Sequence, residues 1–445
     1  MPSPLSLHRL ADLDLEGREA LCRRAETDLT PFMEPARAIV EDVKTRGDAA
    51  LIDAAAKYEG AYLTPETLKA TTEEFDAAPD KLDGPVKDSI RYAVQAVRRF
   101  HAAGMPEPMW FKEMEKGVMV GERTLPIDSV AGYVPRGKGA FPSVAIMVSV
   151  PAVVAGVARP ILLTPPLPDG SVDAATLFVA REAGVEEVYK VGGAQAVAAV
   201  AYGTQSVPRC RKIVGPGSPW LGAARRLLAD VIDPGMPAGP SESIVFADET
   251  ADPVKTALDL ITESEHGSDS SVFLVTTSQD VIDAVGPEVA RLWMRMGEPW
   301  ASHSRDVLTG PRGGIVLAES LEDAVAFTNA YAPEHLLIES KDPWPYLPRF
   351  RHAGEILLGE NAPFGVANYV LGANNVLPTS GYAHTRSATS VHDFLVRQTV
   401  AYVTSEGYET LAPHAHTLAT YEGFEGHANA TGPLRGGATP MKVER

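Results

Sequence analysis

Cysteine is scarce in this 445-residue chain, which contains only Cys22 and Cys210. Two cysteines far apart in the sequence cannot form a disulfide framework or a cysteine-rich zinc site, and they fit a reducing compartment. The chain also lacks an excess of positive charge, because 40 Lys and Arg stand against 58 Asp and Glu, giving a net charge of −18. Nucleic acids and anionic membranes are bound through clustered basic side chains, so this balance argues against both partners.

Long hydrophobic runs are absent as well. The longest mostly apolar run, 144–158, contains Ser149 and Pro151 and is shorter than the roughly 20 residues that span a bilayer. The chain does not open with a basic segment followed by an apolar one, so we expect no secretory signal and a cytoplasmic location. Hydrophobic residues make up 45% and charged residues 22%, which excludes wholesale disorder and predicts two or three domains with a substantial core.

The hydrophobic pattern changes along the chain. Before residue 130, the three-to-four spacing in Pro35–Tyr58 and Pro85–His101 predicts helices. The segment 105–128 is rich in Pro, Gly and charge, which predicts a connector with a hairpin. From Val130 onward, strand-like and helix-like stretches alternate, as is typical of parallel α/β architecture. Two such runs of about 100 residues predict two sheet domains that face a shared cleft.

The expected elements of the two runs follow the same order. In the first run we predict strands at 129–134, 160–163, 187–191 and 212–214, and helices at 150–157, 174–183, 194–202 and 219–229. In the second we predict strands at 243–247, 271–276, 313–316 and 355–358, and helices at 253–266, 278–296 and 321–331. After Tyr369 we expect loop, one helix near 391–406, and a C-terminal end that either frays or lies on a partner chain.

Two carboxylate–histidine pairs are candidates for chemistry. Glu263 and His266 are three residues apart at the end of a predicted helix, so they either bind a divalent cation together or form a solvated helix end. Glu334 and His335 are adjacent, directly before the apolar segment 336–338. There the histidine can act as a base and the glutamate can activate water, or the pair is a surface turn.

Two glycine-rich turns follow predicted strands and open predicted helices, at 191–195 and 215–218. Backbone N–H groups at such positions can bind a phosphate, although ordinary strand-to-helix turns are the alternative. Neither turn matches the GxGxxG pattern, so the usual dinucleotide fingerprint is absent.

Taken together, these segments resemble the histidinol dehydrogenase family over about residues 30–430. The motifs that carry the resemblance are GYVPRGKGAFPSV (132–144), LLTPPLPDG (162–170), VGGAQAVAAVAYGT (191–204), KIVGPGSPW (212–220), AGPSES (238–243), ESEH (263–266), NAYAPEHL (329–336) and NNVLPTSGYA (374–383).

The resemblance implies an α/β fold with two Rossmann-like parallel-sheet domains and small extension domains in an intertwined homodimer. It implies a first Rossmann-like domain from 29–104 with 242–389, and a second, on the NAD side, from 131–241. It also implies an N-terminal extension, 1–28, that packs with 105–130, and a C-terminal extension, 390–445, that contributes to the partner's active site.

The resemblance further implies oxidation of an amino alcohol to an amino acid in two hydride transfers to NAD, with bound zinc. His335 would remove the alcohol proton, and Glu334 would activate the water that attacks the aldehyde. The other implied positions are Tyr133, Gln195 and Ser218 for NAD; Glu263, His266, Asn368 and the partner subunit's His427 for zinc; and Ser241, Asn375 and Glu422 for the substrate.

Several positions depart from the family pattern. The family has Gln at position 263 and Asp at position 368, whereas this chain has Glu263 and Asn368. The summed charge of the two positions stays −1, so we expect zinc binding to be retained, although manganese suits the same ligands. Asn375 replaces a family histidine, and Arg136 and Arg386 add cations.

These departures predict a small polar primary alcohol, carrying for example a carboxylate or sulfonate that arginine can bind. Three alternatives remain open. The arginines are solvated or contact NAD phosphates; the substrate is histidinol itself; or the chain is a non-catalytic metal- or ligand-binding paralogue. Neither cysteine falls in a catalytic motif, so we expect no covalent thiohemiacetal.

Overall fold

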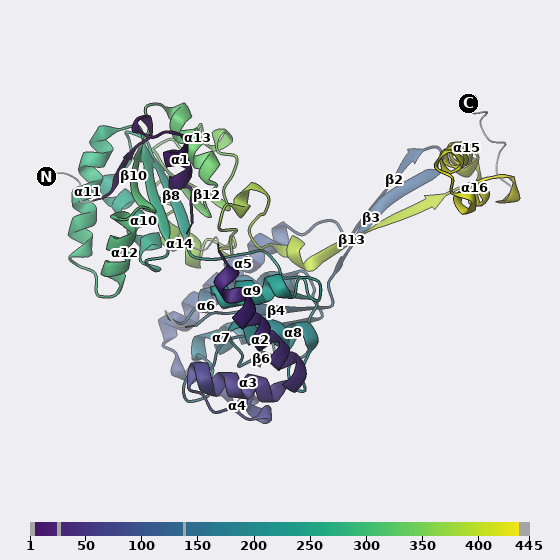
Figure 1. Ribbon diagram of the computed structural model, residues 1–445, viewed down its shortest axis with the longest axis horizontal. Coiled ribbons are helices and arrows are strands. Elements are labelled where there is room, and N and C mark those ends of the chain that lie inside the picture. Colours follow the sequence, from purple (N-terminus) through teal and green to yellow (C-terminus); the bar gives the residue numbers. More distant parts are fainter. Residues whose placement is uncertain (1–4, 25–27, 137–138, 436–445) are drawn as a thin grey trace. The chain divides into compact units, whose positions relative to one another are not determined.

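The computed structural model describes residues 5–24, 28–136 and 139–435. The chain divides into two compact units, shown with their elements in Figure 1. Unit 1 comprises Met1–Gly104 and Ile127–Phe394, and unit 2 comprises Met105–Pro126 and Leu395–Arg445. Unit 1 has the parallel α/β architecture that the alternating pattern predicted.

Sheet A is the six-stranded parallel sheet of unit 1, with strand order β1-β10-β9-β8-β11-β12. Its strands are β1 (Leu7–Arg9), β8 (Glu242–Ala247), β9 (Ser271–Thr276), β10 (Gly313–Leu317), β11 (His335–Glu339) and β12 (Glu355–Leu358). The accompanying helices are α1 (Leu15–Leu21), α10 (Pro253–Ser264), α11 (Gln279–Trp293), α12 (Trp300–Leu308), α13 (Leu321–Tyr331) and α14 (Phe364–Tyr369). Successive residues of β8 enter cores on opposite faces, which explains its unbroken apolar run.

Sheet B is a four-stranded parallel sheet with strand order β6-β5-β4-β7. Its strands are β4 (Ser129–Tyr133), β5 (Arg159–Leu163), β6 (Val188–Tyr189) and β7 (Lys212–Val214). Its helices are α6 (Pro142–Val154), α7 (Ala174–Ala183), α8 (Gly193–Tyr202) and α9 (Pro219–Leu227). The alanines of α8 are fully buried. Their small side chains allow the neighbouring helices to approach α8 closely.

Four helices that precede sheet B in the sequence pack on its helices. They are α2 (Thr30–Arg46), α3 (Asp48–Ala54), α4 (Thr72–Ala77) and α5 (Gly84–Ala103). Helix α2 covers α8 and α9, whereas α5 covers α6 and α7. The sheet B core therefore includes apolar side chains from the first hundred residues.

Both sheets reverse their direction of winding at one point. In sheet B the chain proceeds from β4 to β5 and β6, and then β7 adds on the other side of β4. In sheet A it proceeds from β8 to β9 and β10, and then β11 adds on the other side of β8. Ligands of open α/β sheets usually bind beyond the carboxyl ends of the strands at such a switch point.

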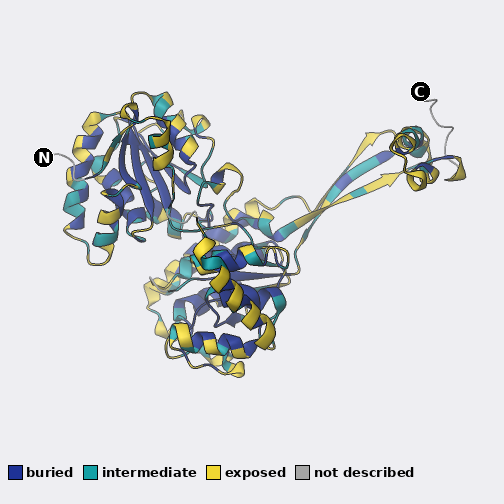
Figure 2. Cartoon of the chain, viewed as in Figure 1, coloured by how far each residue is buried: buried dark blue, intermediate teal, exposed yellow. Residues whose placement is uncertain are grey.

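Unit 2 is a three-stranded antiparallel sheet, in the order β13-β3-β2, followed by two helices. The elements are β2 (Met109–Glu115), β3 (Val118–Pro126), β13 (Leu395–Val403), α15 (Ser405–Glu422) and α16 (Glu425–Thr431). In Figure 2 the central strands of sheet A, β8, β9 and β11, are dark blue and buried, whereas β2 and β13 are largely exposed. A sheet this open keeps apolar side chains on its surface, including Met109, Met114 and Tyr402.

The predicted hairpin within 105–128 is confirmed as β2 and β3. The helix expected near 391–406 is wrong. Residues 395–403 form β13, whose backbone pairs along its whole length with β3, and the helix begins only at Ser405. An isolated sequence window does not reveal a pairing partner that lies 269 to 285 residues away, from Leu395↔Pro126 to Val403↔Val118. Of the expected C-terminal end, residues 436–445 lie outside the described residues.

Two of the expected domain limits differ from the structure. Residues 29–104 pack on sheet B rather than joining 242–389, because the apolar faces of α2 and α5 are covered by helices of sheet B. Residues 7–9 pair with β10 in sheet A, whereas strands β2 and β3 pair with each other and with β13. Residues 7–9 are therefore part of sheet A.

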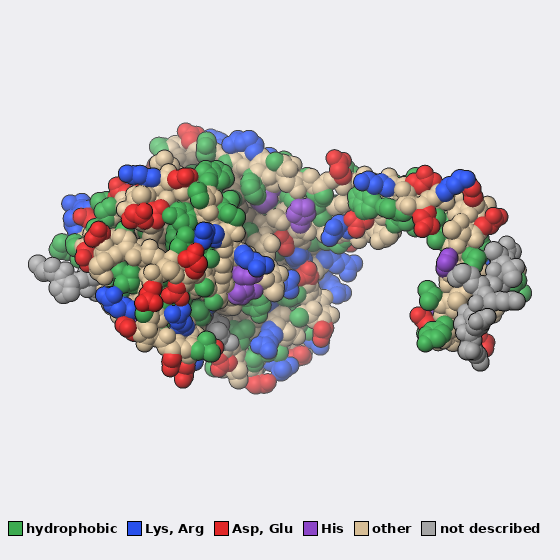
Figure 3. Space-filling model, turned by 90° about the horizontal axis from the view of Figure 1, so that it is seen from above, with side chains coloured by type: hydrophobic (Ala, Val, Ile, Leu, Met, Phe, Trp, Pro, Cys, Tyr) green, Lys and Arg blue, Asp and Glu red, His purple; other side chains and the backbone are tan. Residues whose placement is uncertain are grey.

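The surface mixes charges of both signs. Figure 3 shows acidic and basic side chains interspersed over the displayed face, an arrangement unlike the continuous basic stripe of nucleic-acid-binding proteins. Among the described residues, every helix is too short or too polar to cross a bilayer.

Candidate active site

A cavity of about 690 Å³ in unit 1 contains most of the predicted site residues. On one side it is lined by loops that follow strands of sheet B, namely 135–136 after β4 and 216–218 after β7. On the other side it is lined by residues at or just before the first residues of β8, β9 and β11 in sheet A. The cavity therefore meets the carboxyl ends of sheet B and the amino ends of sheet A.

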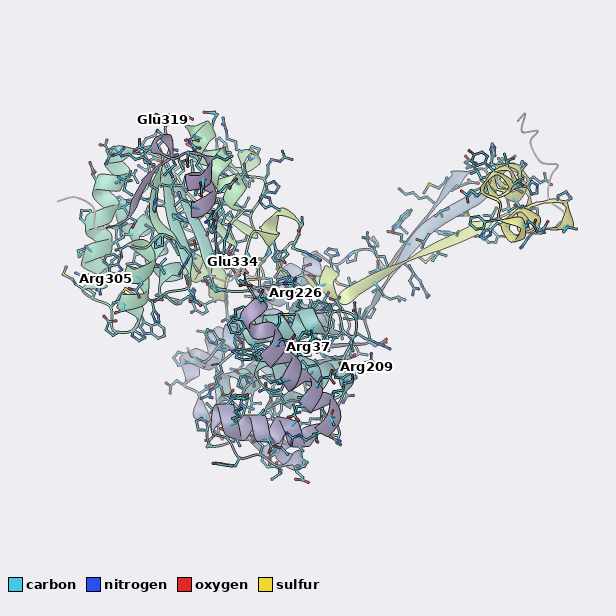
Figure 4. The ribbon with its side chains drawn as sticks, in the orientation of Figure 1. Arg37, Arg209, Arg226, Arg305, Glu319 and Glu334 are labelled. Atoms are coloured by element: carbon cyan, nitrogen blue, oxygen red, sulfur yellow. The ribbon has the colours of Figure 1, made fainter. Side chains whose placement is uncertain are left out.

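Glu334 and His335 are held at the entrance to β11. Helix α13 ends at Tyr331. Its C-cap residue, Ala332, adopts a left-handed conformation with φ of 50°, and Pro333 then precedes the strand. The Oε2 atom of Glu334 accepts a hydrogen bond from the backbone N–H of Glu242 at 3.0 Å. Figure 4 labels Glu334 and Glu319 at opposite ends of sheet A, as expected for residues before β11 and after β10.

His335 lies between two carboxylates. Its Nε2 atom is 3.8 Å from Oε1 of Glu334, and its Nδ1 atom is 2.6 Å from Oε1 of Glu355. Glu355 was predicted only as the first residue of a strand, and its contact with His335 was missed. The two residues are direct partners in the parallel ladder between β11 and β12, a register that a single sequence does not disclose.

The charges around this pair shift both pKa values. Burial raises the pKa of Glu334 to about 8, although the charge of His335 opposes this rise and the charges of Glu263 and Glu242 add to it. Burial lowers the pKa of His335, but Glu263, Glu334 and Glu355 together raise it to about 10. Glu263 is the strongest of the groups that raise it.

Three of the predicted metal ligands lie together. Glu263, in the last turn of α10, is fully buried, and its Oε2 atom is 3.1 Å from Nδ1 of His266. Its Oε1 atom accepts a hydrogen bond of 2.8 Å from Nδ2 of Asn368 on α14. Burial raises the pKa of Glu263, but His266, His335 and these hydrogen bonds lower it to about 2, so the carboxylate is ionised.

Two predicted substrate residues contact this cluster. The hydroxyl of Ser241 is 3.1 Å from Nδ1 of His266, and Nδ2 of Asn375 donates to Oδ1 of Asn368 at 2.6 Å. Both residues also line the cavity. The structure thus brings together side chains from four separate segments that the sequence only suggested were related.

The cluster fits a zinc ion in its donor types. An ionised buried carboxylate, an imidazole and an amide oxygen are oxygen and nitrogen ligands of the kind that zinc accepts. Across 5–24, 28–136 and 139–435, no three His, Cys, Asp or Glu side chains form a metal-holding group. The expected set includes an asparagine, and its fourth member, His427, lies on α16 in unit 2. Glu422 also lies in unit 2, as the last residue of α15.

The predicted NAD residues surround the helix starts of sheet B. Ser218 is the N-cap of α9 and lines the cavity. Tyr133 ends β4, and its hydroxyl accepts a hydrogen bond of 3.1 Å from the N–H of Gly193, while Gln195 is buried in the first turn of α8. The cavity's described lining includes neither Tyr133 nor Gln195. Gly215 has φ of 115°, and a Cβ there would lie 2.3 Å from the Tyr133 carbonyl oxygen.

The two candidate anion-binding arginines differ. Arg136 lines the cavity, where it donates to the carbonyl oxygen of Pro166 at 2.7 Å and lies 3.9 Å from Glu59. Arg386 is exposed and is not among the described residues that line the cavity. The same walls carry carboxylates at Glu265 and Asp269.

The fold and the cavity define a Rossmann-like α/β protein with two switch-point sheets. A sequence profile of the histidinol dehydrogenase family matches residues 22–433, and the chain belongs to that family. The family comprises NAD-dependent, zinc-binding oxidoreductases with a dimeric fold that oxidise an alcohol by way of the aldehyde.

Individual relatives cover nearly the whole chain. A histidinol dehydrogenase homolog from Colwellia psychrerythraea is 51% identical over 435 residues, 98% of each chain. A histidinol dehydrogenase from Synechocystis is 43% identical over 422 residues, 95% of this chain and 97% of the relative. The crystal structure of histidinol dehydrogenase from Elizabethkingia anophelis matches with a TM-score of 0.92 at 30% identity and covers 98% of both chains.

Proposed function

We propose that this protein is an NAD- and zinc-dependent dehydrogenase that oxidises a small polar primary alcohol, other than histidinol, through the aldehyde to the carboxylate. The observation that supports the proposal is the position of the Glu334–His335 pair in one cavity with Glu263, His266 and Asn368. The balanced reaction consumes one alcohol, one water and two NAD⁺, and it yields one carboxylate, two NADH and three protons.

Different residues of this chain act in the two oxidation steps. His335 takes the hydroxyl proton of the alcohol on Nε2, and bound NAD would supply the hydride acceptor for the alcohol carbon. Glu334, held by the N–H of Glu242, then takes a proton from the water that attacks the aldehyde. Zinc held by Glu263, His266, Asn368 and the partner subunit's His427 would polarise the substrate oxygen and offset the charge of Glu263. Tyr133, Gln195 and Ser218 would hold NAD on the sheet B side.

We infer the proposed class of substrate from two residues that line the cavity, Asn375 and Arg136. Asn375 replaces a family histidine and turns its amide toward Asn368, so it presents no ionisable group to the substrate. Arg136 supplies a cation that suits a carboxylate or sulfonate, and Ser241 and the partner subunit's Glu422 complete the substrate contacts. A second candidate is histidinol itself, which the acidic side chains of Glu265 and Asp269 favour through its ammonium group.

The test is NADH formation by the zinc-loaded protein against a panel of primary alcohols, comprising histidinol, neutral diols, and carboxylate- or sulfonate-bearing diols. We expect a neutral or anionic alcohol to turn over at about 1–1000 per second. Turnover of histidinol in that range would overturn the substrate proposal. Stoichiometric zinc binding with no NADH formed from any alcohol would instead support a non-catalytic paralogue.

We also propose that each active site receives His427 and Glu422 from the partner subunit. Unit 2 has exposed apolar side chains at Leu418, Tyr421 and Phe424, close to both residues in sequence, which suits packing against a second chain. Mixing His335→Asn subunits with His427→Ala subunits tests this arrangement. Heterodimers would then contain one intact site, so a statistical mixture should recover about a quarter of wild-type activity. No recovery from verified heterodimers would place His427 in its own chain's site.

The location that we propose is cytoplasmic, supported by the free thiols of Cys22 and Cys210.

A further inference from the structure

We propose that Glu355 is a positioning residue for His335. Its carboxylate accepts the Nδ1 proton, which leaves the Nε2 lone pair for the alcohol proton and stabilises the imidazolium that forms. This inference deepens the proposed function, because it takes His335 as the base that removes the alcohol proton.

The register of sheet A sets this contact. His335 and Glu355 are the first residues of adjacent parallel strands and are direct partners across the ladder. The N–H of Glu355 donates to the carbonyl oxygen of Glu334 at 3.0 Å, and the N–H of Gly354 donates to that of Pro333 at 2.9 Å. A Cβ at Gly354 would lie 2.5 Å from the Glu334 carbonyl oxygen, so glycine permits the close approach of these two strands.

The two nitrogens of His335 face different groups. Nδ1 is 2.6 Å from Glu355, whereas Nε2 is directed toward Glu334 at 3.8 Å. The side chains of His335 and Glu355 are only 4% and 9% exposed, so water competes little for the short hydrogen bond. A carboxylate on one ring nitrogen fixes the tautomer and leaves the other nitrogen as the proton acceptor.

The negative charge of Glu355 is directed mainly at the imidazole. Its second oxygen, Oε2, is buried and has no hydrogen-bond partner among the described residues. The other titratable groups around His335 come from three elements: Glu334 beside it, Glu263 and His266 at the end of α10, and Glu242 on β8. The ring of Phe364 on α14 packs nearly perpendicular to the imidazole, with the ring centres 5.6 Å apart, and adds no charge. Glu355 is the group that combines charge with contact at Nδ1.

Two variants separate the hydrogen bond from the charge. Glu355→Leu removes the acceptor, whereas Glu355→Gln keeps an acceptor oxygen and removes the charge. Glu360→Gln is the matched control, because Glu360 follows the same strand but pairs with Lys255 on α10. Thermal melting of all variants establishes that each is folded.

The first measurement is ¹⁵N NMR of histidine-labelled, zinc-loaded protein without substrate, with the His335 signals assigned by their loss in His335→Asn. We expect neutral His335 to carry its proton on Nδ1 in the wild type, in the Glu360→Gln control and in Glu355→Gln. We expect a mixture of tautomers in Glu355→Leu. The Nδ1-protonated form alone in folded Glu355→Leu would overturn the proposal, and this result does not depend on whether any alcohol is oxidised.

The second measurement is the pH dependence of kcat/KM with an alcohol found in the panel. Glu355→Leu should lower kcat about a hundredfold and Glu355→Gln about tenfold, with KM changed less than about threefold. The acidic limb of both profiles should move to lower pH, because His335 loses the charge that favours its protonated form. Equal losses in all variants with an unmoved limb would indicate only a structural role and would contradict the proposal.

Discussion

Sheets A and B wind with the same switch-point topology, yet they present opposite ends to the cavity. Sheet B contributes the loops after β4 and β7, the carboxyl ends at which α/β proteins usually bind ligands. Sheet A contributes residues at the amino ends of β8, β9 and β11. We propose that this difference separates two tasks, because glycine-rich helix starts suit dinucleotide binding and the rigid amino ends of strands suit proton transfer.

The carboxyl-end switch point of sheet A supports this division. There Asp248 follows β8 and accepts hydrogen bonds from Thr250 and from the hydroxyl of Tyr346 at 3.0 Å. The polar groups of this loop thus bind each other beside a smaller cavity of about 320 Å³. In sheet A the candidate site lies at the amino ends of the strands. The rule that ligands bind beyond the carboxyl ends at a switch point would therefore have pointed to the other end of this sheet.

The largest effect should come from the sheet A side. His335→Asn should lower kcat at least about a thousandfold, since it removes the proton acceptor. The Kd for NADH, measured by fluorescence titration, should change little because we propose that NAD binds on the sheet B side. A large loss of NADH affinity in this variant would show that the two tasks are not separated.

The next effect concerns the turn after β7. Gly215→Ala should destabilise the fold by about 2–4 kcal/mol and weaken NADH binding, because its Cβ would clash with the Tyr133 carbonyl oxygen at a φ of 115°. Chemical denaturation and NADH titration measure both changes. Gly222→Ala in α9 is the control, since its nearest contact is Leu29 at 3.6 Å, and it should leave both values near wild type. Equal effects of the two substitutions would argue against the close approach at Gly215.

A smaller effect should distinguish the two oxidation steps, that of the alcohol and that of the aldehyde. Glu334→Gln should slow oxidation of supplied aldehyde about a hundredfold, and oxidation of the alcohol to the aldehyde less than tenfold, because only the former needs an activated water. Single-turnover NADH formation from each substrate measures the two rates. Equal impairment of both would contradict the separate roles of Glu334 and His335.

The smallest effect concerns the far end of β11. Burial, with Asp259 and Glu360, raises the pKa of Glu339 from 4.5 to about 8. The folded state therefore retains a proton that the unfolded chain has lost, and the free energy of unfolding should fall as pH rises between these values. Glu339→Gln should remove this fall and be about 1 kcal/mol more stable than wild type above the upper value. The same pH dependence in wild type and variant, by denaturant titration, would refute this assignment.

Much of the α/β pattern could be predicted because local periodicity determines it. Helices 174–183 and 321–331 and strand 271–276 match the structure residue for residue. The strand β13 and the partners of α2 could not be predicted, since both depend on contacts between segments distant in sequence. Figure 1 shows how far apart in the sequence the neighbouring elements of unit 1 are.

The candidate site could be predicted from the sequence to a similar extent. Motifs brought out Glu263, His266, Glu334 and His335, and the structure gathers them in one cavity. Glu355 carried no signal, because a glutamate at a strand start is ordinary until the register places it opposite His335. Hydrogen bonds such as that between Asn375 and Asn368 likewise depend on three-dimensional proximity.

The proposed function depends most on the cavity being a site of two successive oxidations. The most direct measurement is the ratio of NADH formed to alcohol consumed by the zinc-loaded protein when the alcohol is limiting. We expect two NADH per alcohol, with the carboxylate as the product. A ratio of one with aldehyde accumulating, or no NADH with any alcohol of the panel, would contradict it.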